Sequence, residues 1–231
     1  LVVLGVLDDA KEIGITFRLV AQLICCLILV GSGLVINNMG NYMFLPNIEI
    51  GSLSILFTIF CVIGLTNSFN FIDGVDGLCS CLSLISILSI IFICVLNNKL
   101  QFLVDLKLLV FLCITIFFFI FFNITSFFKI FLGDSGSIFL GFIVAWILIS
   151  TAQDKNELMH PVLAIWCVTL PVFDLTSVVI RRILRKINPF KPDRRHVHHI
   201  LIELGYSKTN TFLIIIFSSI FLNFFGLIIF Y

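Results

Sequence analysis

Residues 78–96 read LCSCLSLISILSIIFICVL, nineteen residues without a charged side chain. This length is close to the ~20 apolar residues that a helix needs to cross a bilayer. Similar apolar windows recur along the chain, and they predict spanning helices at about 15–36, 53–66, 78–96, 102–122, 137–152, 161–180 and 211–231. The sequence therefore predicts an all-α polytopic membrane helix bundle with about seven spanning helices.

The composition of the whole chain agrees with a membrane protein. Of its 231 residues, 60% are hydrophobic and 12% are charged, whereas about a quarter of the residues in a soluble domain are charged. This balance excludes a soluble globular enzyme, a disordered chain and a secreted disulfide scaffold. A net charge of +1 gives no support for a nucleic-acid partner. The eight cysteines lie mainly in apolar runs, where we expect small buried hydrophobic groups without a redox role.

The first seven residues, LVVLGVL, are apolar but too few to span a bilayer. They also lack the basic flank and the cleavage site of a signal peptide. We interpret them as the remnant of an eighth spanning helix. On this interpretation residues 1–231 are an N-terminally truncated fragment of a single integral-membrane domain.

Basic residues divide the connections between these helices into two unequal sets. By simple alternation, one set holds residues 8–18, 67–77, 123–136 and 181–210. Its eleven basic residues are Lys11, Arg18, Lys129, Arg181, Arg182, Arg185, Lys186, Lys191, Arg194, Arg195 and Lys208. The opposite set holds only three, which are Lys99, Lys107 and Lys155. The positive-inside rule therefore places the first set in the cytoplasm, and we expect a multi-pass plasma (inner) membrane protein whose functional face is cytoplasmic.

The stretch TNSFNFIDGVDGL at 66–78 carries a polar residue at every third position. The four residues are Asn67, Asn70, Asp73 and Asp76. In helical or tight 3₁₀-like geometry this spacing places amides and carboxylates along one side. A polar loop between two spans is the alternative. Since ionisable residues near a membrane are functional candidates, we favour a binding site.

Two further acidic motifs belong to the same predicted face. LGVLDD at 4–9 ends in Asp8 and Asp9, and FLGDSGSIFLG at 131–141 carries Asp134. Solvated charges at a helix end are the simpler explanation for the Asp pair. For Asp134 the simpler explanation is an N-terminal helix cap, although such a helix terminus also favours phosphate.

The fourth motif, NPFKPDRRHVHH at 188–199, is rich in basic and imidazole groups. It contains three of the four histidines of the protein, which are His196, His198 and His199, beside Arg194 and Arg195. A loop that anchors on anionic lipid is one alternative, and a zinc site formed by the histidines is another. The pattern better suits a phosphate-rich ligand, because Arg binds phosphate oxygens in a bidentate manner.

Together the four motifs predict a site for a divalent cation and a diphosphate. Five carboxylates on one face would repel one another without a cation; they are Asp8, Asp9, Asp73, Asp76 and Asp134. Oxygen donors of this kind favour Mg²⁺ or Mn²⁺, and Mg²⁺ commonly bridges carboxylates and substrate phosphates. This chemistry fits phosphoryl transfer to a membrane-embedded acceptor.

In their order and on one face, these motifs resemble those of the polyprenyl-phosphate N-acetylhexosamine-1-phosphate transferases. The form PFKPDRRHVHH resembles the bacterial undecaprenyl-phosphate GlcNAc-1-phosphate transferase branch. The resemblance implies that Asp8 and Asp9 are catalytic and act on the lipid phosphate. It also implies that Asn70 and Asp134 hold Mg²⁺. Family members usually have further spanning helices before the first motif, so we expect part of the nucleotide pocket to lie outside this chain.

The remaining motif positions are implied to bind substrate. Asp73 and Asp76 match acids of the nucleotide-sugar pocket, with Asp76 near the uracil, and Phe131 matches an aromatic that stacks on this base. We expect Asn67 to bind substrate beside them. The loop implied to contact the diphosphate and the sugar contains Arg194, Arg195, His196, His198 and His199.

The implied reaction transfers N-acetylhexosamine-1-phosphate, GlcNAc-1-phosphate by preference, from a UDP-N-acetylhexosamine to undecaprenyl phosphate. UMP is released, and the product would begin a lipid-linked cell-surface glycan. Another UDP-sugar specificity, including that of the phospho-N-acetylmuramoyl-pentapeptide transferases, is the nearest alternative. An ion-coupled transporter is the alternative from another class, but it predicts acids at the bilayer midplane rather than at one edge. The sequence leaves open whether the protein forms a homodimer.

Overall fold

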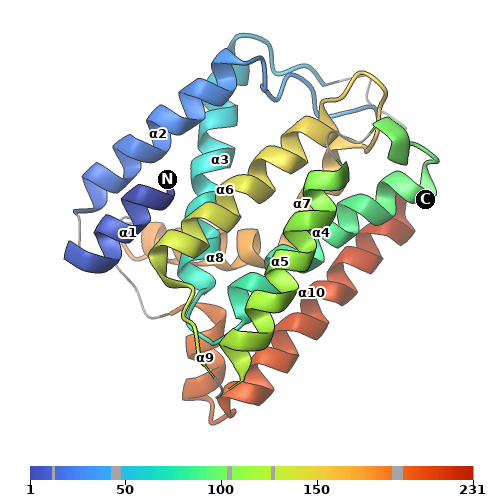
Figure 1. Cartoon of the computed structure of the whole chain (residues 1–231). Coiled ribbons are helices and arrows are strands. Elements are labelled where there is room, and N and C mark those ends of the chain that lie inside the picture. Colours follow the sequence, from blue (N-terminus) through green and yellow to red (C-terminus); the bar gives the residue numbers. More distant parts are fainter. Residues whose placement is uncertain (12–13, 43–47, 103–105, 126–127, 189–194, 231) are drawn as a thin grey trace.

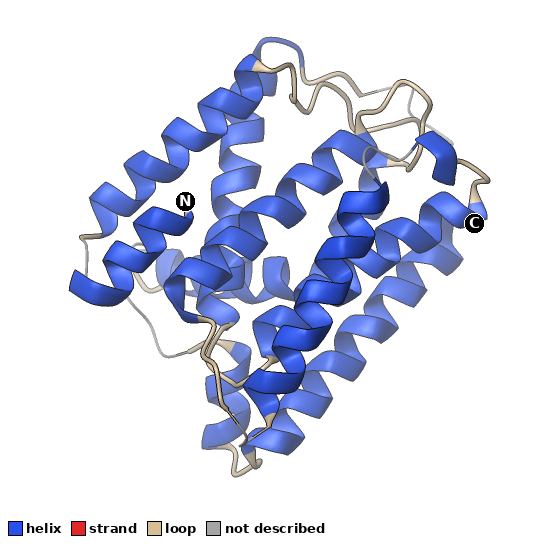
Figure 2. Ribbon diagram, viewed as in Figure 1, coloured by secondary structure: helices blue, strands red, loops and turns tan. Residues whose placement is uncertain are grey.

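The computed structural model describes residues 1–230 except 12–13, 43–47, 103–105, 126–127 and 189–194. The described part is helical apart from its loops and one isolated antiparallel bridge, between Asn38 and Glu49 (Figures 1 and 2). The α-helices are α1 (Val2–Lys11), α2 (Ile15–Gly31), α3 (Ser54–Ile72), α4 (Leu78–Leu96), α5 (Leu106–Ile124), α6 (Gly133–Ala152), α7 (Pro161–Cys167), α8 (Thr169–Leu184), α9 (Val197–Glu203) and α10 (Lys208–Phe230).

Five of the described helices are long and apolar enough to cross a membrane. They are Gly51–Ile72, Leu78–Leu96, Leu106–Ile124, Gly133–Ala152 and Lys208–Phe230. The bent pair α7 and α8 would make a sixth span, and α2, with 17 residues, is apolar but shorter. The predicted all-α polytopic bundle is therefore confirmed, whereas the number of about seven spans stays a prediction.

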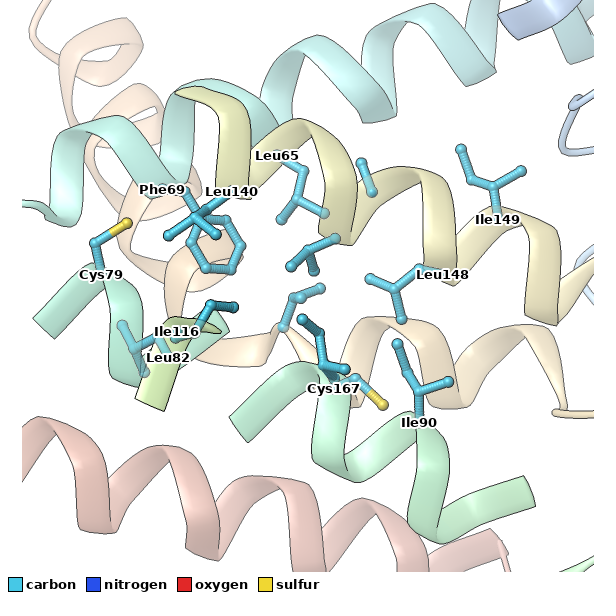
Figure 3. Packing of buried hydrophobic residues seen from close by; sticks show 14 of the residues in the cluster. Leu65, Phe69, Cys79, Leu82, Ile90, Ile116, Leu140, Leu148, Ile149 and Cys167 are labelled. Carbon is cyan, nitrogen blue, oxygen red and sulfur yellow. The ribbon is translucent and has the colours of Figure 1, made fainter. Parts of the chain in front are cut away.

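The central packing of the bundle joins α3, α4, α6 and α7 (Figure 3). Phe69 of α3 is fully buried, and Gly141 of α6 lies against it and against the Thr66 backbone. A β-carbon at Gly141 would lie only 2.9 Å from the Phe69 side chain, so a glycine is required for this close approach. The outer helices α5 and α10 expose many large apolar side chains, as expected for helices that face lipid.

The predicted span at 161–180 differs from the structure, because its helix breaks after Cys167. Helices α7 and α8 meet at an angle of 81°. Pro171 has no N–H to donate to the carbonyl of Cys167, and Ser86 of α4 donates its hydroxyl to this oxygen at 2.8 Å instead. Val168, between the helices, has φ −126° and ψ 23°. The proline and the hydroxyl thus explain why one apolar window forms two helices.

The connections gather at opposite ends of the bundle, as the alternation of helices predicts (Figure 1). At one end, the Gln153 side chain accepts from the backbone N–H of Asn37 at 2.9 Å, and Lys99 donates to the Glu157 carbonyl at 2.7 Å. At the other end, Lys129 lies 2.6 Å from Asp76. This second end, where α9 also lies, carries the motifs that the sequence singled out.

Candidate functional site

Three helices meet the side chain of Arg18, near the start of α2. Its Nη2 lies 2.6 Å from Asp8 Oδ2 of α1 and 3.3 Å from Asp134 Oδ2 of α6. Its Nη1 donates to Asn70 Oδ1 of α3 at 3.2 Å. The Asn70 amide nitrogen donates in turn to Asp134 Oδ1 at 2.9 Å. We call Asp8, Arg18, Asn70 and Asp134 the arginine cluster; its guanidinium group connects motifs that are up to 126 residues apart.

Asp9 lies beside this cluster and contacts the first turn of α6. Its Oδ1 accepts a hydrogen bond from the backbone N–H of Asp134 at 2.8 Å, and its Oδ2 accepts from that of Ser135 at 3.3 Å. The residue before α6, Leu132, provides no side-chain cap of its own. A carboxylate is favourable here because the first N–H groups of a helix have no partner within it. Asp9 of α1 therefore caps α6, a role that the sequence did not predict.

We expect Asp9→Ala to lower the free energy of unfolding by about 1–2 kcal/mol, because the first turn of α6 loses its acceptor. Asp9→Asn keeps one acceptor oxygen and should lose less. Thermal unfolding in detergent measures both effects. Lys11→Ala, on the exposed side of the same helix, is the matched control, and equal melting temperatures for Asp9→Ala and this control would contradict the cap.

The oxygen atoms of Asn70 and Asp134 fit a hard divalent cation. Among the described residues, no group of three or more His, Cys, Asp or Glu side chains is arranged to hold a metal ion. Mg²⁺, however, commonly binds through one or two carboxylates and completes its shell with water and substrate phosphates. Asn70 Oδ1 and Asp134 Oδ2 contact the Arg18 guanidinium group, and Asp134 Oδ1 accepts from the Asn70 amide nitrogen. These oxygens therefore already face a positive group, and a cation would bind there by taking over contacts that Arg18 makes.

The two acids of the 66–78 motif, Asp73 and Asp76, follow the end of α3. This helix continues to Ile72, beyond the predicted end at residue 66, so Asn67 and Asn70 lie on a helix and not in the polar loop that was the alternative. Asp73 is the residue after its last turn. Asp76 pairs with Lys129 at 2.6 Å. The Lys129 ammonium also lies 5.2 Å from the centroid of the Phe131 ring, which is exposed. The structure thus brings Asp76 and Phe131, both predicted to face a uracil, to one lysine.

The pKa of Asp73 is raised from its ordinary value of 3.8 to about 7. Burial is the largest cause, and the negative charges of Asp134, Asp76 and Asp9 raise it further. Between these two pH values the folded protein therefore holds more protons than the unfolded chain. The contribution of Asp73 to the free energy of unfolding therefore decreases as the pH rises from about 4 to about 7.

Asp73→Asn removes this titration, so we expect the variant to be more stable than the wild type at pH 8 and equally stable near pH 4. Melting temperatures in detergent across this range, without added divalent cations, measure the difference. Asp154→Asn, at the opposite end of the bundle, is the control for a change of one carboxylate. Parallel pH profiles for the wild type and Asp73→Asn would contradict the assigned pKa.

The fourth motif is bonded to α8 at His196 and Val197. We call its three histidines, His196, His198 and His199, the histidine motif. His196 Nδ1 lies 2.8 Å from Asp174 Oδ2, and the backbone N–H of Val197 donates to Asp174 Oδ1 at 2.8 Å. The His196 ring also lies on Phe71, one residue after Asn70, with 5.3 Å between the ring centroids. The histidine motif and the end of α3 are therefore in contact.

His198 lies deeper than its neighbours, with 1% of its surface exposed. It packs so closely against Gly74 that no β-carbon could be accommodated there. The pKa of His198 is lowered from 6.5 to about 4, so the ring is neutral at pH 7. Burial is the largest cause, His199 and His196 also lower the pKa, and Asp174 opposes them. His199 packs on His198 with 4.1 Å between their ring centroids.

Among the described residues, no side-chain contact joins Asn67 or Arg195 to this arrangement. The Asn67 amide nitrogen donates to Gln22 of α2 at 2.8 Å and to the Ile63 carbonyl, so Asn67 contributes to helix packing. Arg195 contacts Arg181 through its backbone oxygen. Arg194 lies outside the described residues.

Sequence reasoning did not assign Arg18 and Asp174 to the site. Arg18 contributes only to the count of basic residues, and Asp174, within the predicted span at 161–180, belongs to none of the four motifs. Both are ionisable groups within predominantly apolar helices, which is a signal of function in membrane proteins. Their partners could not be read from the sequence, because the partner residues come from other helices.

Comparison with known proteins agrees with these motifs. The family model described as "Glycosyl transferase family 4" matches residues 1–152. The undecaprenyl-phosphate alpha-N-acetylglucosaminyl 1-phosphate transferases of Haemophilus influenzae and Pasteurella multocida are each 40% identical over 92 residues, which is 40% of this chain and 26% of each relative. The Escherichia coli K12 protein of the same name is 39% identical over 88 residues, or 38% of this chain and 24% of the relative.

The matched segment thus spans about a quarter of the length of these relatives. The family model extends further and covers about two thirds of the chain, from α1 to the end of α6. It includes three of the four motifs and every member of the arginine cluster. The chain belongs to glycosyl transferase family 4.

Proposed function

We propose that this chain is the catalytic part of a transferase that moves N-acetylhexosamine-1-phosphate from a UDP-sugar to undecaprenyl phosphate. GlcNAc is the preferred sugar, because the relatives named above are N-acetylglucosaminyl 1-phosphate transferases. The reaction would take place on the cytoplasmic side of the plasma membrane and would release UMP. The excess of basic residues at this end of the bundle supports the orientation.

One observation carries the proposal, namely the meeting of motifs from α1, α3 and α6 around Arg18. Its guanidinium group contacts Asp8, Asn70 and Asp134. A diphosphate needs positive charge and hydrogen-bond donors, which a guanidinium group supplies in a planar arrangement. The carboxylates and the amide oxygen suit the cation that accompanies such a substrate.

We further propose direct transfer. An oxygen of the lipid phosphate forms a bond to the β-phosphorus of the UDP-sugar. The bond between this phosphorus and the bridging oxygen breaks, and the electron pair leaves with UMP. Arg18 would stabilise the charge on the diphosphate, while Asp8 would orient or deprotonate the lipid phosphate. Since a phosphate monoester has a second pKa of about 6, it is already largely ionised at neutral pH, so the contribution of a base is modest.

The Asn70 and Asp134 oxygens would hold Mg²⁺. A divalent cation there would neutralise charge on the diphosphate. Asp76, Phe131 and Lys129 would bind the nucleoside, because an aromatic ring and a carboxylate suit the face and the edge of a base. The histidine motif would contact the diphosphate and the sugar from the side of α8.

An apolar cavity of about 260 Å³ suits the isoprenoid tail of the acceptor. It lies between α3, α6, α7 and α8, and its lining is almost wholly apolar, with Phe60, Leu148 and Val172 among its residues. The lining extends from Ile36, beside the opposite end of the bundle, to Thr176 of α8. Thr176 is two residues from Asp174, so the cavity reaches the helix that holds the histidine motif.

Gly64 offers a test of this cavity, because it lines the cavity and a β-carbon there meets no atom within 4 Å. We expect Gly64→Leu to raise the KM for undecaprenyl phosphate about tenfold by filling the cavity, with little change in the KM for the UDP-sugar. Gly31→Leu is the matched control, since Gly31 is equally unobstructed and does not line the cavity. Equal KM values for the two variants would exclude this cavity as the lipid site.

The proposed function is tested by incubating the full-length protein in detergent with undecaprenyl phosphate, Mg²⁺ and one UDP-sugar at a time. The panel contains UDP-GlcNAc, UDP-GalNAc and UDP-MurNAc-pentapeptide. We expect UMP release and a lipid-diphosphate product, fastest with UDP-GlcNAc. Preference for another sugar would correct the specificity, whereas absence of UMP with every sugar would refute the proposed function.

A further inference from the structure

Asp174 is a buried acid on α8 that the proposed chemistry does not use directly. Only 4% of its side chain is exposed. Burying a carboxylate is costly unless it is paired and hydrogen-bonded. Both of its oxygens have partners, since Oδ2 contacts His196 Nδ1 and Oδ1 accepts from the Val197 N–H, each at 2.8 Å. The same carboxylate therefore holds both the ring of His196 and the first turn of α9.

This contact determines which nitrogen of His196 carries the hydrogen. A neutral imidazole has one N–H, and an ionised carboxylate can only accept. Nδ1 must therefore donate to Asp174, which leaves the lone pair of the neutral ring on Nε2, at the opposite edge. No hydrogen bond of Nε2 occurs within the described part of the chain, so this nitrogen is available to a ligand.

The environment of His196 connects this nitrogen to the proposed site. The ring lies on Phe71, whose neighbour Asn70 belongs to the arginine cluster. It is also stacked nearly parallel to His198, at 6.1 Å and 7°. On the other side, Val172 and Thr176, two residues from Asp174 in either direction, line the apolar cavity. Residues two apart on a helix point to nearly opposite sides, so α8 itself separates the cavity from the carboxylate that holds the imidazole.

We propose that Asp174 is a positioning residue that holds His196 as its Nδ1–H tautomer and presents Nε2 to the diphosphate of the substrate. The role in catalysis rests on the proposed function. The effect of Asp174 on the His196 ring does not, because it follows from the contact alone. Groups that orient metal-binding histidines in this way contribute a factor of about 10–100, and we expect an effect of this size for Asp174.

Asp174→Asn is the decisive variant. Its amide oxygen can still accept from the Val197 N–H, but its NH₂ group then faces His196 Nδ1. Since two donors cannot pair, Nδ1 must become the acceptor, and the hydrogen moves to Nε2. Asp174→Glu keeps a carboxylate and should restore the original tautomer. Ser177→Ala, one turn along α8, is the matched control, because the Ser177 hydroxyl donates to the backbone carbonyl of Asp174 and not to its carboxylate.

Nitrogen NMR of histidine-labelled full-length protein in nanodiscs reads the tautomer directly, since only four histidines contribute and His196→Gln assigns the signal. We expect Nδ1–H in the wild type, Asp174→Glu and Ser177→Ala, and Nε2–H in Asp174→Asn. In the UMP assay we expect Asp174→Asn to lower kcat roughly 10–100-fold with KM values changed less than about threefold.

The same tautomer in the wild type and Asp174→Asn, or an unchanged kcat, would overturn the proposal. If Asp174→Asn does not fold, Asp174→Glu compared with Asp174→Gln poses the same question, because these two differ only in carboxylate against amide. If the wild type releases no UMP from any UDP-sugar, the proposed function fails, while the tautomer measurement still decides whether Asp174 sets the state of His196.

Discussion

Asp134→Ala should reduce UMP release by about 10²–10³-fold, since it removes a carboxylate that contacts both Arg18 and Asn70. In the proposed mechanism this carboxylate also holds Mg²⁺, so its loss affects the charge on the diphosphate directly. The measurement is UMP release by the full-length protein at saturating UDP-GlcNAc and undecaprenyl phosphate. Raising the Mg²⁺ concentration should restore little of the rate.

Asp134→Asn separates the charge from the shape of the side chain. The asparagine can still accept from the Asn70 amide, so the fold should persist while the rate stays low. Ser135→Ala, the next residue of the same turn, is the control and should retain near-normal activity. Near-normal UMP release by Asp134→Ala would refute the metal assignment.

Arg18→Ala should lower the free energy of unfolding by about 3 kcal/mol, because breaking a buried ion pair is strongly destabilising. The pair that matters is with Asp8, whose side chain is 3% exposed; the pair with Asp134, which is 40% exposed, contributes less. Arg18→Lys keeps the charge but cannot contact Asp8 and Asn70 through two separate nitrogens, so it should lose an intermediate amount. The free energy of unfolding in detergent is measured for the wild type, Arg18→Ala and Arg18→Lys.

A double-mutant cycle distinguishes the ion pair from simple loss of packing. Asp8→Asn and Arg18→Gln each remove one charge, whereas the double variant contains two neutral amides that can bond to each other. We expect the double variant to be less destabilised than the sum of the single variants by 0.5–3 kcal/mol, the usual range for residues in contact. Additive losses would show that the two side chains do not depend on each other.

Much of the fold could be predicted from the sequence, because a bilayer requires long apolar helices and the apolar windows are visible. The helix starting at Leu78 and the one ending at Phe230 lie close to their predicted positions. The break after Cys167 was not predicted. Pro171 lies near the middle of that window, but the carbonyl that it leaves free is satisfied by Ser86, more than 80 residues earlier.

The site could be predicted only as a list of motifs. The carboxylates and histidines drew attention because charged groups are rare in this chain. Their pairing depends on which helices touch, and this is why no sequence pattern indicates that Asp9 caps α6. The catalytic role of Asp9 stays a prediction. Likewise, the partner of Asn67 is Gln22. The two residues lie on different helices, so no local sequence pattern contains both.

The cap on α6 has a consequence for the order in which the protein is made. Asp9 and the amide of Asp134 are separated by 125 residues. At 5–20 residues per second, a ribosome needs roughly 6–25 s to travel between them. During this interval α1 is already synthesised, but the amides that its carboxylate will bind do not yet exist. The face that carries the motifs can therefore assemble only after α6 has entered the membrane.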